Sequence, residues 1–451
     1  MRFLSLIVGC LLLSAQFQVH ADAQAQAAPW TVRPEWVSGH MNFLASDALQ
    51  GRGSATRDEL IAANYIAAQF ESYGLKPAPG MSGYVQKAVI PQERFEGKAG
   101  VSWAAGKSVE PTLFMSDGQP VQGRITLAGT LDPKQLNAGK GEVLLADGDA
   151  SPMAWLGAAR QQGVKLLVLR ESEATRKSYA NFGGEPRLMR SERRAGMPAV
   201  LTVPGAVFDQ LTAAQGQALS FTPPRVVASQ LVTTNAIGYL QGTDPKAGTL
   251  LFTAHLDHLG LKADGTIMHG ANDNASGTVA VMELARALAG GTRPKRSILF
   301  VCFGGEELGL LGAGYFTEHP PVPLKEVVAN LEFEMIGAQD PTLPQRTLMM
   351  TGYERSDFGE AMAARGFRIA PDPYPAMQFF QRSDNYQLAV RGVVAHTVSG
   401  WATTPTYHQA NDDLAHIDLG FMTTVIQSLI EPARWLADGD FVPQWKAGQK
   451  P

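Results

Sequence analysis

Seven residues of the types that bind metal ions lie between positions 255 and 408, each expected at the end of a strand or in the loop that follows. They are His255, Asp257, Asp273, Glu306, Glu307, Glu334 and His408. Imidazoles and carboxylates are ligands that zinc takes in hydrolytic sites. Two imidazoles with several carboxylates therefore indicate a site with two zinc ions.

The first three of these residues occur in two short segments. His255 and Asp257 are two positions apart at the end of an apolar run, so their side chains point to one side of a strand. The carboxylate can then hold the imidazole, or both can face one cation. Asp273 lies in the polar, glycine-flanked turn 270–277, which can present both of its oxygens to two ions; alone, it would be interpreted as a helix N-cap.

The later carboxylates are also concentrated after apolar strands. Glu306 and Glu307 follow one strand across two glycines, and adjacent carboxylates there are costly unless a cation compensates their charge. Glu332 and Glu334 lie on one face of another strand, and His408 lies in a loop near the C-terminus. Each residue alone has an ordinary structural explanation, but seven of them at strand ends favour a metal site.

Five motifs that contain these residues resemble those of the di-zinc metallopeptidases, the family of bacterial leucyl aminopeptidases, aminopeptidase Y and glutamate carboxypeptidase II. In chain order they are His255-Leu-Asp257, Gly270-Ala-Asn-Asp-Asn-Ala-Ser-Gly277, Phe303-Gly-Gly-Glu-Glu-Leu-Gly309, Asn330-Leu-Glu-Phe-Glu-Met-Ile-Gly337 and Tyr407-His408. The combination is specific, although each short motif is not. The resemblance covers about 30–110 and 229–440.

The resemblance implies two zinc ions per chain, held by five of these residues. His255 and Glu334 would hold one ion, Glu307 and His408 would hold the other, and Asp273 would bridge them and be followed by a cis peptide bond. The family usually has an aspartate where this chain has Glu334, so the added methylene puts the occupancy of that zinc site in question. We expect Glu334 to bind nevertheless.

The resemblance also implies the catalytic roles of two further carboxylates. Glu306 would be the general base that takes a proton from the attacking water and passes it to the leaving amine. Asp257 would orient His255. Tyr407 is a candidate to hydrogen-bond a tetrahedral intermediate, with packing an equally good account.

Other residues near these motifs have weaker claims. His258 and His269 are expected to surround the ligands or lie at the surface, and Cys302 to be buried and inert. Arg52, in a loop-like segment, is expected to be solvated or to touch a substrate. Candidates to line an apolar substrate pocket, with core packing as the alternative, are Phe303, Phe379, Phe380 and Trp401.

The pattern of elements predicts an α/β fold. From about 229 to 440, nearly continuous apolar strands alternate with helices, which is typical of a mixed, mostly parallel central sheet with helices on both faces. Active groups of such sheets gather beyond the carboxyl ends of the strands. Before this region, a first α-rich stretch is expected to about residue 110, with its clearest helix starting at the capping box Thr56-Arg-Asp-Glu59 and stopping at Gly74.

The interval 113–228 has a different texture, with short strands, turns and none of the histidines. It is predicted to be an inserted, β-rich α+β domain, which the resemblance identifies with the protease-associated domain of many family members. The predicted organisation is a signal peptide at 1–21, an N-terminal part of the peptidase domain at 22–112, the insertion at 113–228, the main part of the peptidase domain at 229–440 and a tail at 441–451.

Composition agrees with a secreted or periplasmic enzyme. A positive residue, an apolar run too short to span a bilayer and small residues before position 22 favour a cleaved signal peptide. Its removal would take away Arg2 and Cys10, which changes the formal net charge from −4 to −5 and leaves one cysteine. This mildly acidic chain has no basic stripe for nucleic acid, so we expect peptide substrates and no membrane span.

The leading hypothesis is a zinc aminopeptidase that removes N-terminal residues from peptides. A carboxypeptidase or dipeptidase on the same fold is an alternative, with Arg382 and Arg391 as candidates to hold a free carboxylate. Glutaminyl cyclase is disfavoured because it uses one zinc ion. A catalytically inactive peptide-binding module is also disfavoured, because a scaffold has no need of Glu306.

Overall fold

The computed structural model describes residues 30–451 except 105, 137–140, 149, 182–183 and 190–195. The expected signal peptide lies outside these residues. Within them, no helix has the length and apolar character that crossing a bilayer requires. The α-helices are α1 Pro34–Leu44, α2 Arg57–Ser72, α3 Pro152–Gln161, α4 Glu173–Asn181, α5 Gly205–Ala213, α6 Gly277–Ala289, α7 Leu311–Glu318, α8 Phe358–Ala363, α9 Asn385–Ala389 and α10 Leu419–Asp438.

An eight-stranded mixed sheet carries the candidate site. In spatial order its strands are β1 Val85–Glu96, β11 Arg225–Leu240, β15 Ser297–Phe303, β12 Thr249–His255, β16 Val327–Glu334, β19 Ala395–Ser399, β17 Leu348–Met350 and β18 Ile369–Pro371. The four central strands β15, β12, β16 and β19 are parallel. Strands β11 and β17 pair antiparallel to the two sides of this parallel set.

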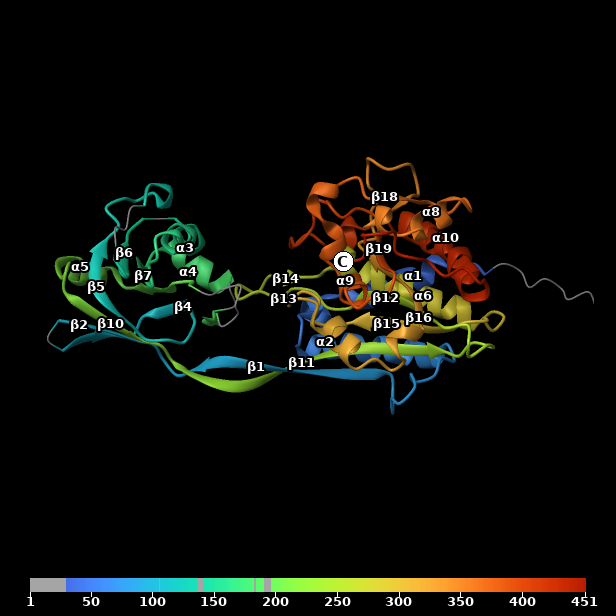
Figure 1. The fold of residues 1–451 in the computed structure, drawn as a ribbon, viewed down its shortest axis with the longest axis horizontal. Coiled ribbons are helices and arrows are strands. Elements are labelled where there is room, and N and C mark those ends of the chain that lie inside the picture. The colour runs from blue at the N-terminus through green and yellow to red at the C-terminus, as the bar shows by residue number, and fades with distance from the viewer. Residues whose placement is uncertain (1–29, 105, 137–140, 149, 182–183, 190–195) are drawn as a thin grey trace, which may run out of the picture. The chain divides into compact units, whose positions relative to one another are not determined.

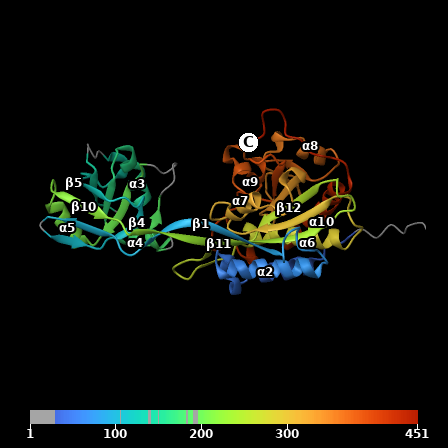
Figure 2. The ribbon, with the colours of Figure 1, turned by 60° about the horizontal axis from the view of Figure 1, so that its bottom comes forward.

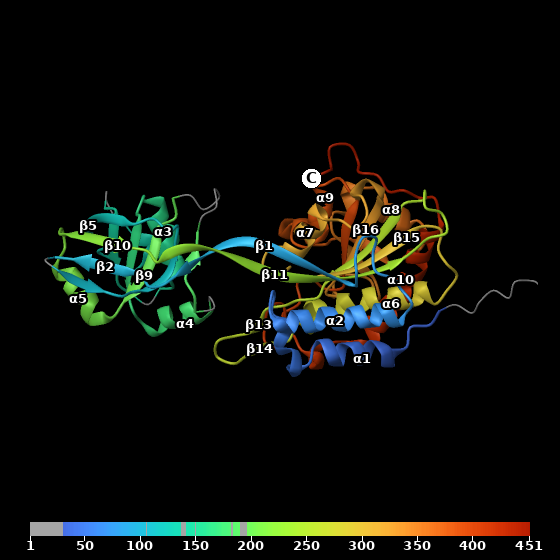
Figure 3. The same cartoon turned by 90° about the horizontal axis from the view of Figure 1, so that it is seen from below.

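Helices cover both faces of this sheet. Helix α6 packs against β12, β15 and β16, together with α2, α10 and α1, whereas α7 and α9 pack against the other face (Figures 2 and 3). Alternate side chains of β15 point to opposite faces of the sheet. Leu299 and Val301 pack in the core with α7 and α9, and Phe300 contacts Phe70 of α2. The predicted α/β class, with a mixed, mostly parallel sheet between helices, is confirmed.

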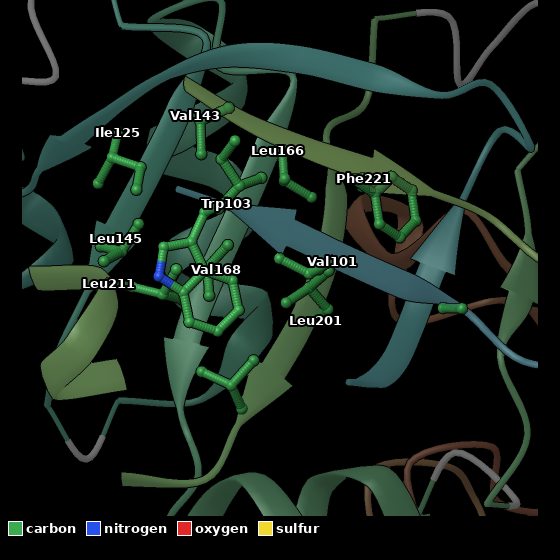
Figure 4. Close-up of a cluster of buried hydrophobic side chains, with 14 of the residues drawn as sticks. Val101, Trp103, Ile125, Val143, Leu145, Leu166, Val168, Leu201, Leu211 and Phe221 are labelled. Carbon is green, nitrogen blue, oxygen red and sulfur yellow. The ribbon is translucent and has the colours of Figure 1, made fainter. Parts of the chain in front are cut away.

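A second sheet of nine strands has its own core (Figures 1 and 4). In spatial order its strands are β3 Lys107–Val109, β2 Gly100–Trp103, β10 Ala218–Thr222, β5 Val121–Leu127, β6 Val143–Ala146, β7 Leu166–Arg170, β9 Ala199–Val203, β4 Thr112–Ser116 and β8 Arg187–Leu188. Val101, Trp103, Val143, Val168 and Phe221 belong to a buried cluster of this sheet. The sheet begins earlier than the predicted insertion at 113–228.

The expectation of an α-rich stretch to about residue 110 is only partly right. Helix α2 forms as predicted: the Thr56 hydroxyl accepts hydrogen bonds from the first turn, and the chain leaves the helix through Gly74 at a φ of 83°. The segment Val85–Glu96, however, is the long strand β1. It contains Pro91, six of its 12 residues are polar, and it pairs along its whole length with β11. Long-range pairing, which local pattern does not reveal, determines this strand.

Arg52 joins three segments beneath the carboxyl edge of the sheet. Its side chain is fully buried and donates hydrogen bonds to the carbonyl oxygens of Leu44, Leu256, His269 and Gly270, at 2.5 to 2.9 Å. Burial lowers its pKa to about 10, opposed by the nearby carboxylate of Asp257. The expectation that Arg52 is solvated or touches substrate is therefore wrong. The residue instead fixes the backbone beside His255 and before Asp273.

We expect Arg52→Met to destabilise the protein strongly, because four buried carbonyl groups lose a charged donor. Lost hydrogen bonds of this kind predict a cost of at least about 3 kcal/mol. Thermal unfolding should show a Tm lower by roughly 5 °C or more. Arg57→Met is the matched control because its side chain is 85% exposed. Equal Tm values for the two variants would contradict this role of Arg52.

Candidate metal centre

The sheet brings the predicted site residues to the carboxyl edge of its parallel strands. His255 ends β12, Glu334 ends β16, Glu306 and Glu307 follow β15, Asp273 precedes α6, and His408 follows β19. In the parallel register, Thr253 of β12 lies opposite Glu332 of β16, so His255 and Glu334 reach the edge at the same level. This arrangement follows from strand lengths and pairing rather than from local sequence.

The first ligand group surrounds the ring of His255. Its Nε2 atom lies 3.2 Å from Asp273 Oδ1 and 3.1 Å from Glu334 Oε1. The three ligand atoms all lie within 4.8 Å of one another. Glu334 therefore reaches the same point as His255 and Asp273 despite its added methylene.

The second ligand group shares Asp273 with the first. His408 Nε2 lies 3.2 Å from Asp273 Oδ2 and 3.2 Å from Glu307 Oε1. The structure also brings in His258, whose Nδ1 atom is 2.9 Å from Glu307 Oε1 and 3.8 Å from Asp273 Oδ2. His258 is fully buried, so two histidines face the same carboxylate pair.

The residues present fit two bound cations. Asp273 Oδ2, Glu307 Oε1 and both ring nitrogens of His258 are buried and lack a well-aligned hydrogen-bond partner among the described residues. Burial opposes charge on His408, yet Asp273 and Glu307 raise its pKa to about 10. Burial would raise the pKa of Asp273, but His255 and His408 lower it. The site thus attracts positive charge strongly, and the peptide bond from Asp273 to Asn274 is cis, as the resemblance implies.

Asp257 fixes the turn that carries the paired glutamates. Its carboxylate oxygens accept hydrogen bonds from the backbone N–H groups of Glu306 at 3.2 Å and Glu307 at 3.3 Å, and from the hydroxyl of Ser54 at 2.5 Å. The same carboxylate lies 3.7 Å from His255 Nδ1, which is closer, at 3.2 Å, to the Asp257 carbonyl oxygen. Asp257 therefore contacts the histidine and the glutamate turn together.

Glu306 lines the central cavity on a turn that glycine makes possible. A Cβ at Gly304 would approach the carbonyl oxygen of Thr234 to 2.5 Å, and Gly305 has a φ of 68°. Burial raises the pKa of Glu306 well above its usual value; Asp384 adds to this, whereas His255 opposes it. A carboxyl group with a raised pKa in a cavity is suited to accepting and returning a proton.

Glu334 is held in place by a network of hydrogen bonds that includes Ser383 and Glu332. The hydroxyl of Ser383 lies 2.8 Å from Glu334 Oε2 and 2.9 Å from Glu332 Oε1. Glu332 also accepts hydrogen bonds from the Asn385 backbone and the Thr397 hydroxyl. Burial, followed by the charge of Glu334, raises the pKa of Glu332 to about 7. These contacts position the longer side chain that this chain has in place of aspartate.

The cavity between these groups holds about 60 Å³. Besides the five candidate acidic and histidine ligands and Glu306, its walls include Met335, Met349, Thr351, Phe379, Arg382, Ser383, Thr397, Ser399, Ala402 and Tyr407. The ring of Tyr407 stacks on His408, with centroids 3.9 Å apart. The cavity is therefore narrow, with an acidic side at the ligands and a mixed apolar and hydroxyl side.

Several candidates lie away from the cavity. Of the aromatic residues proposed to line it, only Phe379 does so; Phe303 and Phe380 belong to the core, and Trp401 is half-buried beside Thr403. Cys302 is buried in β15, as expected. His269 pairs with Asp47, and Arg391 lies near Glu318.

Two supporting residues, Ser54 and Asp412, were missed in the sequence. Ser54 bonds Asp257, and Asp412 accepts hydrogen bonds from the backbone N–H groups of Asn272 and Asp273. Asp384 is fully buried, and neither carboxylate oxygen has a partner among the described residues. Asp384 lies in the run Arg382-Ser-Asp-Asn-Tyr386, which resembles the Ser-Asp-containing substrate loop of the di-zinc metallopeptidases. Ser54 and Asp412 lie in polar loops, where nothing local marks them.

Comparison with known proteins supports the same assignment. Residues 235–431 match the model of Peptidase family M28. Leupeptin-inactivating enzyme 1 of Streptomyces exfoliatus is 34% identical over 202 residues, which cover 41% of this chain and 44% of that protein. Aminopeptidase YwaD of Bacillus subtilis is 36% identical over 105 residues, covering 23% and 22%. The chain therefore spans less than half the length of these two relatives.

Solved structures show the same fold. An aminopeptidase from Aneurinibacillus sp. strain AM-1 aligns with a TM-score of 0.57 at 19% identity, over 91% of this chain and 96% of that one. BSAP, a zinc aminopeptidase from Bacillus subtilis, aligns with a TM-score of 0.57 at 20% identity, over 89% and 95%. The predicted family resemblance is confirmed by the match of residues 235–431 to the model of peptidase family M28.

Proposed function

We propose that the protein is a zinc aminopeptidase that hydrolyses N-terminal residues from peptides. The observation that carries this proposal is the pair of ligand groups that share Asp273 beside a cavity lined by Glu306. His255 and Glu334 would hold one zinc ion, and Glu307 and His408 would hold the other. His258 contacts the second group and is available to it.

Different residues of the chain would carry out different parts of peptide hydrolysis. Two zinc ions, when bound, supply a water molecule of lowered pKa and polarise the scissile carbonyl. Glu306 accepts the proton of the attacking water and delivers it to the leaving amine. Asp257 holds the Glu306 backbone, so the base stays aimed at the cavity. Tyr407 lines the cavity, and its hydroxyl would donate to the carbonyl oxygen as negative charge develops there.

A dipeptidase or carboxypeptidase is the second candidate, and Arg382 favours it. This residue lines the cavity, stacks on Phe379 and forms no ion pair within the described part of the chain. Once two ions offset the acidic ligands, its guanidinium is available for a free substrate carboxylate. Arg391, the other candidate, lines a different pocket.

The organisation and location of the protein are part of the proposal. We assign the nine-stranded sheet to an inserted protease-associated domain, because it has a separate core and contributes no residue to the metal centre. The pattern of residues 1–21 supports a signal peptide and a periplasmic or secreted enzyme.

A substrate panel tests the choice between these activities. Aminoacyl arylamides, N-acylated peptides and dipeptides should be compared with and without a chelator. We expect hydrolysis only of substrates with a free amine, and loss of activity when the chelator removes zinc. Activity on blocked but not free N-termini would contradict the aminopeptidase, and strict dependence on a free carboxylate would favour the alternative.

Glu306→Gln tests the general base. The amide keeps the size of the side chain but cannot accept a proton, so we expect kcat to fall about 10²- to 10⁴-fold. Metal analysis should still find two zinc ions per chain, because Glu306 is not a proposed ligand. Glu326→Gln makes the same change at an exposed position beyond the opposite end of β16 and should leave kcat unaltered. Full activity of Glu306→Gln would overturn this mechanism.

Glu334→Ala tests the atypical ligand. Removal of its carboxylate leaves His255 and Asp273 with one neighbour fewer, and we expect zinc content to fall from two ions per chain to one. Elemental analysis of dialysed protein measures this directly. One zinc ion per chain in both wild type and Glu334→Ala would show that Glu334 binds no metal.

A further inference from the structure

A second hollow lies beside the metal centre. It is a groove of about 300 Å³, lined among others by Ser54, Thr56, His258, Leu259, Leu261, Glu307 and Leu308. Glu307 is shared with the cavity that contains Glu306 and Tyr407. The two hollows therefore share one lining residue, the proposed metal ligand Glu307. We call this hollow the leucine groove.

Three large apolar side chains at the leucine groove are exposed to solvent. Leu259, Leu261 and Leu308 are 37%, 50% and 51% exposed. Ten large apolar residues are exposed among the residues described, and three of them line this groove. Scattered exposed leucines need no explanation, but apolar side chains gathered around a hollow indicate a binding surface.

The groove is held in shape by main-chain hydrogen bonds. The Ser54 N–H donates to the His258 carbonyl at 3.2 Å, and the His258 N–H donates to the Arg52 carbonyl at 3.1 Å. Leu261 lies in the short hairpin of β13 Gly260–Leu261 and β14 Ile267–Met268, where it pairs with Ile267. Leu259 and Leu261 are therefore presented by fixed backbone, so an apolar ligand meets a preformed surface there.

The two hollows fit the two parts of a peptide substrate that is cleaved next to its terminal residue. An exopeptidase needs a confined space for the terminal residue and a longer surface for the rest of the peptide. The narrow cavity fits the first need, and the leucine groove fits the second. Resting on the aminopeptidase proposed above, we infer that the leucine groove binds the residue that follows the scissile bond and favours a large apolar side chain there.

The test compares substrates that differ only after the scissile bond. Tripeptide amides X-Leu-Gly and X-Gly-Gly share the same N-terminal residue X. We expect wild type to show a kcat/KM about tenfold higher for the leucine peptide, as burial of an apolar side chain predicts. Leu261→Ser and Leu308→Ser should each reduce this ratio at least threefold. Leu131→Ser, a 69% exposed leucine in the nine-stranded region, is the control and should leave the ratio unchanged.

The outcomes separate this inference from the proposed function. Hydrolysis of both peptides with equal kcat/KM, or a ratio that survives both groove substitutions, overturns the leucine groove while the aminopeptidase stands. Hydrolysis of neither peptide overturns the aminopeptidase. In that case, calorimetry on the same two peptides tests whether the leucine groove binds an apolar side chain. Tighter binding of the leucine peptide that Leu261→Ser weakens supports the inference, and equal binding of both peptides overturns it. A dimer that Leu261→Ser dissociates would instead assign the leucines to a contact between copies, and overturn the inference.

Discussion

Charge compensation among buried carboxylates is the constraint on which the rest of this structure depends. Asp257, Asp273, Glu332 and Asp384 are all nearly inaccessible to solvent and lie close to one edge of the sheet. Burying an ionised carboxylate without a partner is expensive. Backbone N–H groups, hydroxyl groups, imidazoles and the buried guanidinium of Arg52 supply part of the compensation. Metal cations are the natural source of the remainder, since they bring two positive charges each to a space that side chains already enclose.

The sheet provides the precision that this compensation requires. Parallel strands of matched register end together, so residues far apart in the chain meet without a long loop to position them. The apolar strand interiors, with Phe252 stacked between Phe300 and Phe333, lock the strands against sliding. A register change of one residue would turn His255 or Glu334 to the opposite face. The core thus protects the geometry of the edge as well as the stability of the fold.

The sequence predicted those parts of the molecule that have a local signature. Apolar runs marked the central strands, and polar residues after them marked the ligands, whose meeting at one edge follows from the sheet. Strand β1 was not predicted, because its half-polar, proline-containing sequence becomes a strand only through pairing with β11. The roles of Arg52, Ser54 and Asp412 also escaped, because each depends on backbone atoms that lie far away in sequence. A charged or polar residue in a loop looks solvated until the chain that buries it is known.

The ribbon formed by β1 and β11 has a consequence for how such a chain can change. The strands pair from Val85 opposite Ala236 to Glu96 opposite Arg225, so the intervening segment leaves and returns at directly opposed residues. A tight turn of a few residues could close the same two strands. The segment between these strands therefore has its two ends side by side. Recombination can exchange, lengthen or remove such a segment without altering the path of the strands that carry the candidate metal ligands.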